Sequence, residues 1–171
     1  MVDPSVNIAP PIVKPEDPRH ALWQPWTGEG AAGRFEVVDA ANGHPAMLRI
    51  LEHSRTLAWI SAPRKIEPLV EYRLEAEILG QGLIAIRWAS IAGRCDSQEA
   101  RETVLGESRG PAYGEASWGQ SCVGGVAPRL ATHCRIILQT HEPCLETAFR
   151  NVAMDGLGTS LLEIRYSQAG Y

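Results

Sequence analysis

The sequence lacks three features that would assign it to a common functional class. It has no run of lysine or arginine, and its 16 basic and 20 acidic residues leave a formal net charge of −4. Because a phosphate backbone is bound by a concentrated positive surface, nucleic acid is not an expected partner. No apolar stretch approaches the roughly 20 residues that cross a bilayer. The chain does not begin with a basic region followed by an apolar core, so we expect no signal peptide and no membrane insertion.

Cysteine is scarce, with only Cys95, Cys122, Cys134 and Cys144. A chain of 171 residues can bury about 70% of the surface that its unfolded form exposes, so it needs no disulfide to fold. An even number of cysteines permits two disulfides in three connectivities. The sequence leaves both disulfides and free thiols open.

The strongest pattern runs from Val70 to Ser90, where apolar and polar residues alternate on both sides of Gly80-Gln81-Gly82. A period of two predicts β-strands with one covered face. The apolar set is Tyr72, Leu74, Ala76, Ile78, Ile84, Ile86 and Trp88. We predict a hairpin whose loop is the glycine-rich triplet, with Glu75 opposite Arg87 on the exposed face.

Further alternating segments predict additional strands separated by turn signals. They are residues 34–39, 46–51, 57–61, 132–140, 145–154 and 161–166. The alternation breaks between Phe149 and Val152, which predicts a β-bulge near Arg150 and Asn151. Short strands at this spacing favour a β-sandwich over βαβ units. We therefore expect an all-β fold, an antiparallel β-sandwich of the jelly-roll type.

Two stretches do not alternate. Residues 1–33 are rich in proline, which favours an extended N-terminal arm packed on a single domain of residues 34–171, with Trp23 and Trp26 as anchors. Residues 91–117 are polar and predict a long loop. Within this loop, Asp96 and Glu99 are spaced to cap one short helix over residues 97–105.

Three patterns point weakly to chemistry. Gly106 to Gly110 matches G-x-S-x-G, but that motif works on a strand-to-helix turn, and Pro111 follows here without a helical pattern. We interpret it as a surface loop. A cluster of metal-ligand types fits no zinc framework closely; it comprises His133, Cys134, His141 and Cys144. Glu75 and Glu77 could serve as the carboxylate pair of a glycosidase, so a small glycan-active enzyme stays a minor alternative.

The remaining candidate site is the polar face of the predicted sheet. Its expected members are Arg73, Glu75, Glu77, Arg87, Arg135 and Gln139, with Tyr113 and Trp118 on adjacent loops. Guanidinium and amide groups make paired hydrogen bonds to hydroxyl-rich ligands, and an indole can stack on the apolar face of a sugar ring. An ordinary solvated sheet face explains the same residues equally well.

The order of these elements resembles the carbohydrate-binding modules of the family 4/9 type, over residues 23–154. The matching segments are Trp23, Ala46 to Ile50, Glu71 to Leu74, Ile84 to Trp88, Ser117-Trp118, Arg135 to Leu138 and Ala148 to Met154. The resemblance implies a galactose-binding-domain-like jelly roll without catalytic activity. It also implies an oligo- or polysaccharide ligand held against the concave sheet face or the loop edge. We expect Trp118 and Tyr113 to supply the stacking surface.

The family pattern often includes a structural calcium ion, but Arg150 stands where the family usually has an aspartate. This difference argues against a calcium site. The resemblance implies a location outside the cell or on the surface of a cell or particle. The alternative function is a structural or attachment domain of a larger assembly, such as a phage-like particle, which would contact a protein neighbour through the N-terminal arm.

Overall fold

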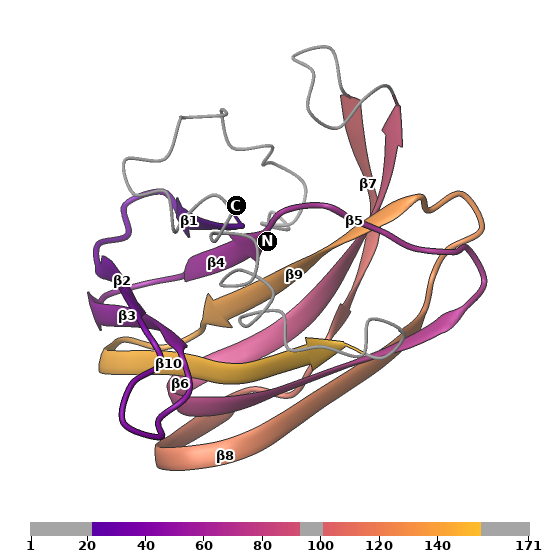
Figure 1. Ribbon diagram of the computed structural model, residues 1–171. Helices are drawn as coiled ribbons and strands as arrows, with labels where there is room; N and C mark the ends of the chain where they lie inside the picture. Colours follow the sequence, from indigo (N-terminus) through magenta and orange to yellow (C-terminus); the bar gives the residue numbers. More distant parts are fainter. Residues whose placement is uncertain (1–21, 93–100, 155–171) are drawn as a thin grey trace, which may run out of the picture.

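The computed structural model describes residues 22–92 and 101–154, which form an all-β structure (Figure 1). The strands are β1 (Trp23–Thr27), β2 (Arg34–Val38), β3 (Met47–His53), β4 (Leu57–Ser61), β5 (Arg64–Lys65), β6 (Glu71–Ala92), β7 (Arg101–Arg109), β8 (Tyr113–Val126), β9 (His133–Thr140) and β10 (Cys144–Met154). All the strand pairs are antiparallel, and the main order is β1-β4-β9-β6-β10-β3-β2. The predicted antiparallel β-sandwich is confirmed. No helix among the described residues is long and apolar enough to cross a membrane.

The predicted hairpin at residues 70–90 is wrong, because this stretch is one continuous strand of 22 residues, β6. Its first half pairs with β8 and β10, and its second half pairs with β9 and β7. Glu75 and Arg87 therefore lie on different halves and do not face each other. The alternation was interpreted correctly, but the partners of each half come from elsewhere in the chain.

Strand β6 bends so strongly that its two ends meet across the core. The rings of Tyr72 and Trp88 lie 6.1 Å apart between centroids, whereas a straight strand would separate them by about 53 Å. The bend divides the structure into two packed layers. We call β2, β3, β10, the first half of β6 and β8 the first sheet. The second sheet contains β1, β4, β9, the second half of β6, β7 and β5.

Gly80 makes the corner possible. Its φ of +92° is a conformation that L-residues avoid. A Cβ atom there would overlap the carbonyl oxygen of Glu146 and the side chain of Thr147. The Thr147 hydroxyl accepts a hydrogen bond from the Gln81 backbone N–H at 3.1 Å, so β10 supports the bend directly.

The core between the layers consists of the residues that alternation predicted. Leu74 and Ile78 of the first sheet share one apolar cluster with Ile84 and Ile86 of the second. Phe35 of β2 meets Trp59 of β4 edge to face, with 5.1 Å between ring centroids. Burial of such side chains contributes about 1.5–3 kcal/mol each, which is the main force holding the layers together.

The predicted long loop with a short helix is also wrong within the described residues. Residues 101–109 form β7 and residues 113–126 form β8, whereas residues 97–100 of the expected helix lie outside the described part. Both strands lie at sheet edges and are largely exposed to solvent, so a strict apolar alternation is not required of them. The G-x-S-x-G motif lies mostly on β7, where the Ser108 hydroxyl accepts a hydrogen bond from the Trp88 indole N–H at 3.1 Å.

The predicted β-bulge is confirmed. The pairing of β10 with β6 shifts between Arg150 and Ala153, and Asn151 has a φ of +51°. Of the expected N-terminal arm, residues 23–27 form β1 at the edge of the second sheet. Residues 1–21 of the arm, and the strand expected at 161–166, lie outside the described residues. Three cysteines are free thiols, namely Cys122, Cys134 and Cys144.

Candidate functional site

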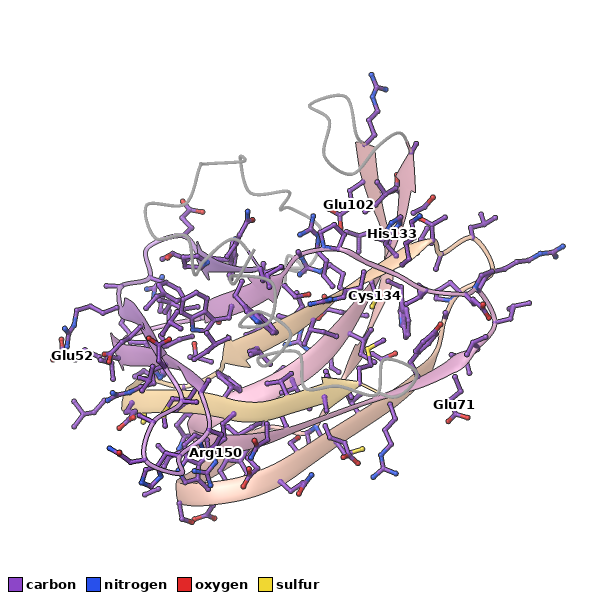
Figure 2. All side chains as sticks on the ribbon, viewed as in Figure 1. Glu52, Glu71, Glu102, His133, Cys134 and Arg150 are labelled. Atoms are coloured by element: carbon purple, nitrogen blue, oxygen red, sulfur yellow. The ribbon has the colours of Figure 1, made fainter. Side chains whose placement is uncertain are left out.

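The eight predicted ligand-binding residues do not form one site. Three of them, Arg87, Arg135 and Gln139, lie on the outward face of the second sheet, as their register with β4 and β7 requires. Arg73, Glu75, Glu77 and Trp118 lie on the outward face of the first sheet. Figure 2 labels a neighbour of each group, Arg150 of β10 for the first sheet and Glu102 of β7 for the second, and these two lie well separated in that view.

On the second sheet, the arginines are engaged in ion pairs. The Arg87 Nε lies 3.3 Å from the Glu107 carboxylate, and both side chains are 9% exposed. Its cross-strand neighbour Arg135 donates to both carboxylate oxygens of Glu102, at 2.9 to 3.1 Å. A charged group in a buried pair has few free hydrogen-bonding positions, so Arg87 is poorly available to a ligand, whereas the Arg135 and Glu102 side chains are 19% and 15% exposed.

The centre of the same outward face is closed to solvent. Ile60, Ala85 and Ile137 lie side by side across β4, β6 and β9, and they are 3%, 0% and 1% exposed. These three residues belong to an apolar cluster on the outward face, separate from the core, and Trp26 packs against it. A ligand would find accessible groups only around its margin, for example at the half-buried Gln139.

On the first sheet, Trp118 of β8 presents a partly exposed indole. The Arg150 guanidinium lies over its ring, with the central carbon 4.0 Å from the ring centroid. Such cation–π contacts contribute about 0.5–1 kcal/mol at exposed sites. The contact covers part of the indole with the guanidinium, and Trp118 lies on a strand although the sequence predicted it to lie on a loop.

The Arg150 guanidinium that contacts this indole belongs to a polar network. The Arg150 Nε and Nη2 atoms donate to the Glu77 carboxylate, each at 3.3 Å, and the Asn151 amide donates to the same carboxylate. The hydrogen bond from Asn151 is the main reason that the pKa of Glu77 lies below its ordinary value; Arg150 adds to this effect, while burial opposes it. Glu77 is therefore an ionised acceptor held by two donors.

The bulge explains why Arg150 and Asn151 can both reach Glu77. A bulge places consecutive residues of one strand opposite a single residue of its partner. The register shift begins at Arg150, which pairs with Glu77. Sequence reasoning found the bulge but did not include Arg150 or Asn151 in the site, although the broken alternation was the signal.

Arg73 and Glu75 extend the polar surface along β6. The Arg73 Nη2 lies 2.9 Å from Glu75 Oε1, and the Arg73 Nε donates to the Cys122 sulfur at 3.0 Å. The Arg73 and Glu75 side chains are 56% and 40% exposed. A ligand on this part of the face would meet charges that are paired but still solvated.

Tyr113 contributes to the corner. Its hydroxyl donates to the backbone carbonyl of Ser117, and its backbone carbonyl lies 2.8 Å from His141 Nε2. Its ring packs over Gly119 and against the core. Tyr113 therefore supports the strand that bears Trp118.

The residues near Arg150 do not fit calcium. A divalent cation needs several oxygen ligands, and here the guanidinium itself neutralises the Glu77 carboxylate. Across the described residues, no group of three or more His, Cys, Asp or Glu side chains could hold a metal ion.

The comparisons with known proteins give a shared fold. No protein-family model and no curated protein sequence matches the chain. A solved structure of the Clostridium thermocellum endo-1,4-β-D-xylanase 10B, comprising CBM22-1 and GH10 modules complexed with xylohexaose, is similar with a TM-score of 0.52. The match has 12% identity and covers 78% of this chain but 26% of the xylanase chain, so the chain spans about a quarter of that structure.

Two further structures are similar at 12% identity and a TM-score of 0.50. A family 16 carbohydrate-binding module-2 is matched over 75% of this chain and 89% of its own. The enzymatically active domain of bacteriophage CBA120 tailspike protein 4 is matched over 77% of this chain and 19% of its own. Identities this low show the fold alone: the chain has the β-sandwich fold found in carbohydrate-binding modules, as its sequence resemblance predicted.

Proposed function

We propose that this protein is a non-catalytic glycan-binding domain whose binding surface is the outward face of the first sheet. The observation that supports it is the partly exposed Trp118 indole, which has the Arg150 guanidinium over its ring, while Glu77 and Asn151 belong to the hydrogen-bond network that holds that guanidinium. An indole face stacks on the apolar face of a pyranose ring. Carboxylate, guanidinium and amide groups at its border suit the ring hydroxyls.

Accessibility favours this face over the second sheet. On this face the Arg150 and Glu77 side chains are 21% and 28% exposed, and the Arg73 and Glu75 side chains are 56% and 40% exposed. On the second sheet both partners of the Arg87 ion pair are 9% exposed, and Arg135 and Glu102 are 19% and 15% exposed. Arg87, Arg135 and Gln139, which the sequence placed in the same site, would form a separate surface. We propose Trp118, Glu77, Arg150 and Asn151 as the principal contacts, with Arg73 and Glu75 beside them.

Such a domain would act where polysaccharides occur, outside the cell or on the surface of a cell or particle. The fold also occurs in the xylanase and tailspike chains described above, as one part of a longer protein. The alternative function, a structural or attachment domain, predicts that the chain binds no glycan.

A glycan array with the labelled full chain tests the proposal. We expect binding that disappears in Trp118→Ala and persists in Trp26→Ala, a matched tryptophan on the outward face of the other sheet. Thermal unfolding of both variants establishes that they are folded. Repeating the array with a chelator should leave binding unchanged, because the residues around Arg150 do not suit calcium. A wild-type chain that binds nothing would refute the proposal.

A further inference from the structure

The edge of the first sheet that β8 forms is long and unprotected. Strand β8 has 14 residues and, within the described part of the chain, pairs only with β6. Figure 1 shows it as the outermost strand, along the lower border of the sheet. An edge strand exposes unpaired backbone N–H and C=O groups, which can pair with another extended chain.

The other edge strands have features that prevent such pairing. Strand β1 contains Pro25 at its middle position, which removes a backbone donor. Strand β2 has five residues, including the ion-paired Arg34 and Glu36. Strand β7 has charged residues near both ends and a glycine with positive φ at Gly106. Short length, charge, proline and irregularity are the recognised protections of sheet edges.

Strand β8 is irregular only where its register with β6 shifts, between Glu115 and Gly119, and its remaining length has none of these protections. Its single charged residue is Glu115, and it contains no proline. The Tyr113 hydroxyl already occupies the Ser117 carbonyl, so the uncovered part is residues 118–126. At its end, Val126 is 57% exposed.

We propose that two copies of this chain associate by antiparallel pairing of β8 with β8. Residues 118–126 contain no charge, so an antiparallel pair of identical strands places no like charges directly opposite each other. The Arg73 guanidinium beside Cys122 is ion-paired with Glu75. A different protein strand that is recognised by its charges would find no complementary charge on residues 118–126. A second copy of the same uncharged strand does not require one. Full overlap of residues 118–126 centres the two-fold axis on Cys122 and sets each Trp118 opposite the Val126 of its partner.

This arrangement has a consequence for ligand binding. Directly opposed residues on antiparallel strands point to the same side of the sheet, so both Trp118 side chains lie on one continuous outward face. Eight residues along the strand separate them by about 26 Å. The association does not depend on the proposed glycan binding, but it would make that binding bivalent.

Analytical ultracentrifugation of the full chain over a concentration series tests the proposal. We expect the mass to rise from 18.7 kDa towards twice that value. Cys122→Ser should associate like the wild type. Cys122→Lys places like charges opposite each other and should weaken association by up to about fivefold. A chain that stays monomeric at every concentration, or equal association of both variants, would overturn the proposal.

A second measurement avoids reliance on a folded lysine variant. Opposed Cys122 residues would have Cα atoms about 4.5–5.5 Å apart, within the range that a disulfide bridges. Diamide, as the oxidant, should therefore yield a covalent dimer of the wild type in which mass spectrometry finds a Cys122–Cys122 peptide. A diamide-treated dimer in which mass spectrometry finds no Cys122–Cys122 peptide would exclude the proposed register and the β8 interface.

Discussion

Replacing Gly80 with alanine tests the bent strand that organises the fold. At Gly80 the backbone has a φ of +92°, which costs an L-residue about 1–2 kcal/mol. The added Cβ would also overlap the Glu146 carbonyl oxygen, a backbone atom that cannot rotate away. Overpacking of this kind costs a further 1–3 kcal/mol or so. We expect Gly80→Ala to lower the free energy of unfolding by about 2–5 kcal/mol.

Gly43→Ala provides the matched control. Gly43 has a similar φ of +79°, but a Cβ there would meet nothing within 4 Å. Both substitutions reduce the entropy of the unfolded chain equally, so their difference isolates the clash at the corner. We expect Gly80→Ala to be worse than Gly43→Ala by about 1–3 kcal/mol.

Urea unfolding followed by tryptophan fluorescence measures both variants, with the midpoints compared at equal m-values. In a hairpin loop, Gly80 would be exposed and the two variants would lose similar stability. Equal losses would therefore refute the continuous, bent β6 and its contact with β10.

Three further predictions concern buried groups. Arg87→Met leaves Glu107 without its buried partner and should cost about 3 kcal/mol in urea unfolding, most of which Arg87→Met with Glu107→Leu should restore. Burial, and then the charge of His141, lower the pKa of His53 below 6.5. The unfolded state therefore binds the proton more tightly than the folded state, so the contribution of neutral His53 to stability should be fully present above about pH 6.5 and be lost as the pH falls below it. His53→Gln should flatten that slope, and an unchanged slope would contradict the assignment. Burial raises the pKa of the Cys134 thiol to about 12, so Cys134 should resist thiol reagents until the chain unfolds, as site-resolved mass spectrometry would show.

The sequence predicted which side chains enter the core but not how the central strand turns. Alternation places Leu74, Ile78, Ile84 and Ile86 on one apolar face whether the strand folds back as a hairpin or bends between two sheets. The glycines around Gln81 suit both geometries because glycine accepts a positive φ. Only the partners supplied by β8, β9 and β10 distinguish them, and those are long-range contacts.

The candidate site was predicted in part for a related reason. Period-two patterns tell which residues share a face of one strand, but not which sheet that strand joins, so Arg87 and Glu77 were expected together. The bulge at Arg150 and Asn151 was readable from the broken alternation. Its consequence, two donors aimed at Glu77, depends on the register with β6. Strand β8 was missed because its glycines and serines lack β-propensity, and Trp118 was therefore expected on a loop.

The most direct test of the central claim is calorimetric titration of the full chain with a glycan that the array identifies. Wild type and Trp26→Ala should bind with the same affinity, whereas Trp118→Ala should lose at least about fivefold, since removing a stacking aromatic from a binding surface typically costs more than about 1 kcal/mol. Such a result would establish the outward face of the first sheet as the binding surface. Full affinity in Trp118→Ala, with loss in Trp26→Ala, would contradict it and place the ligand on the second sheet.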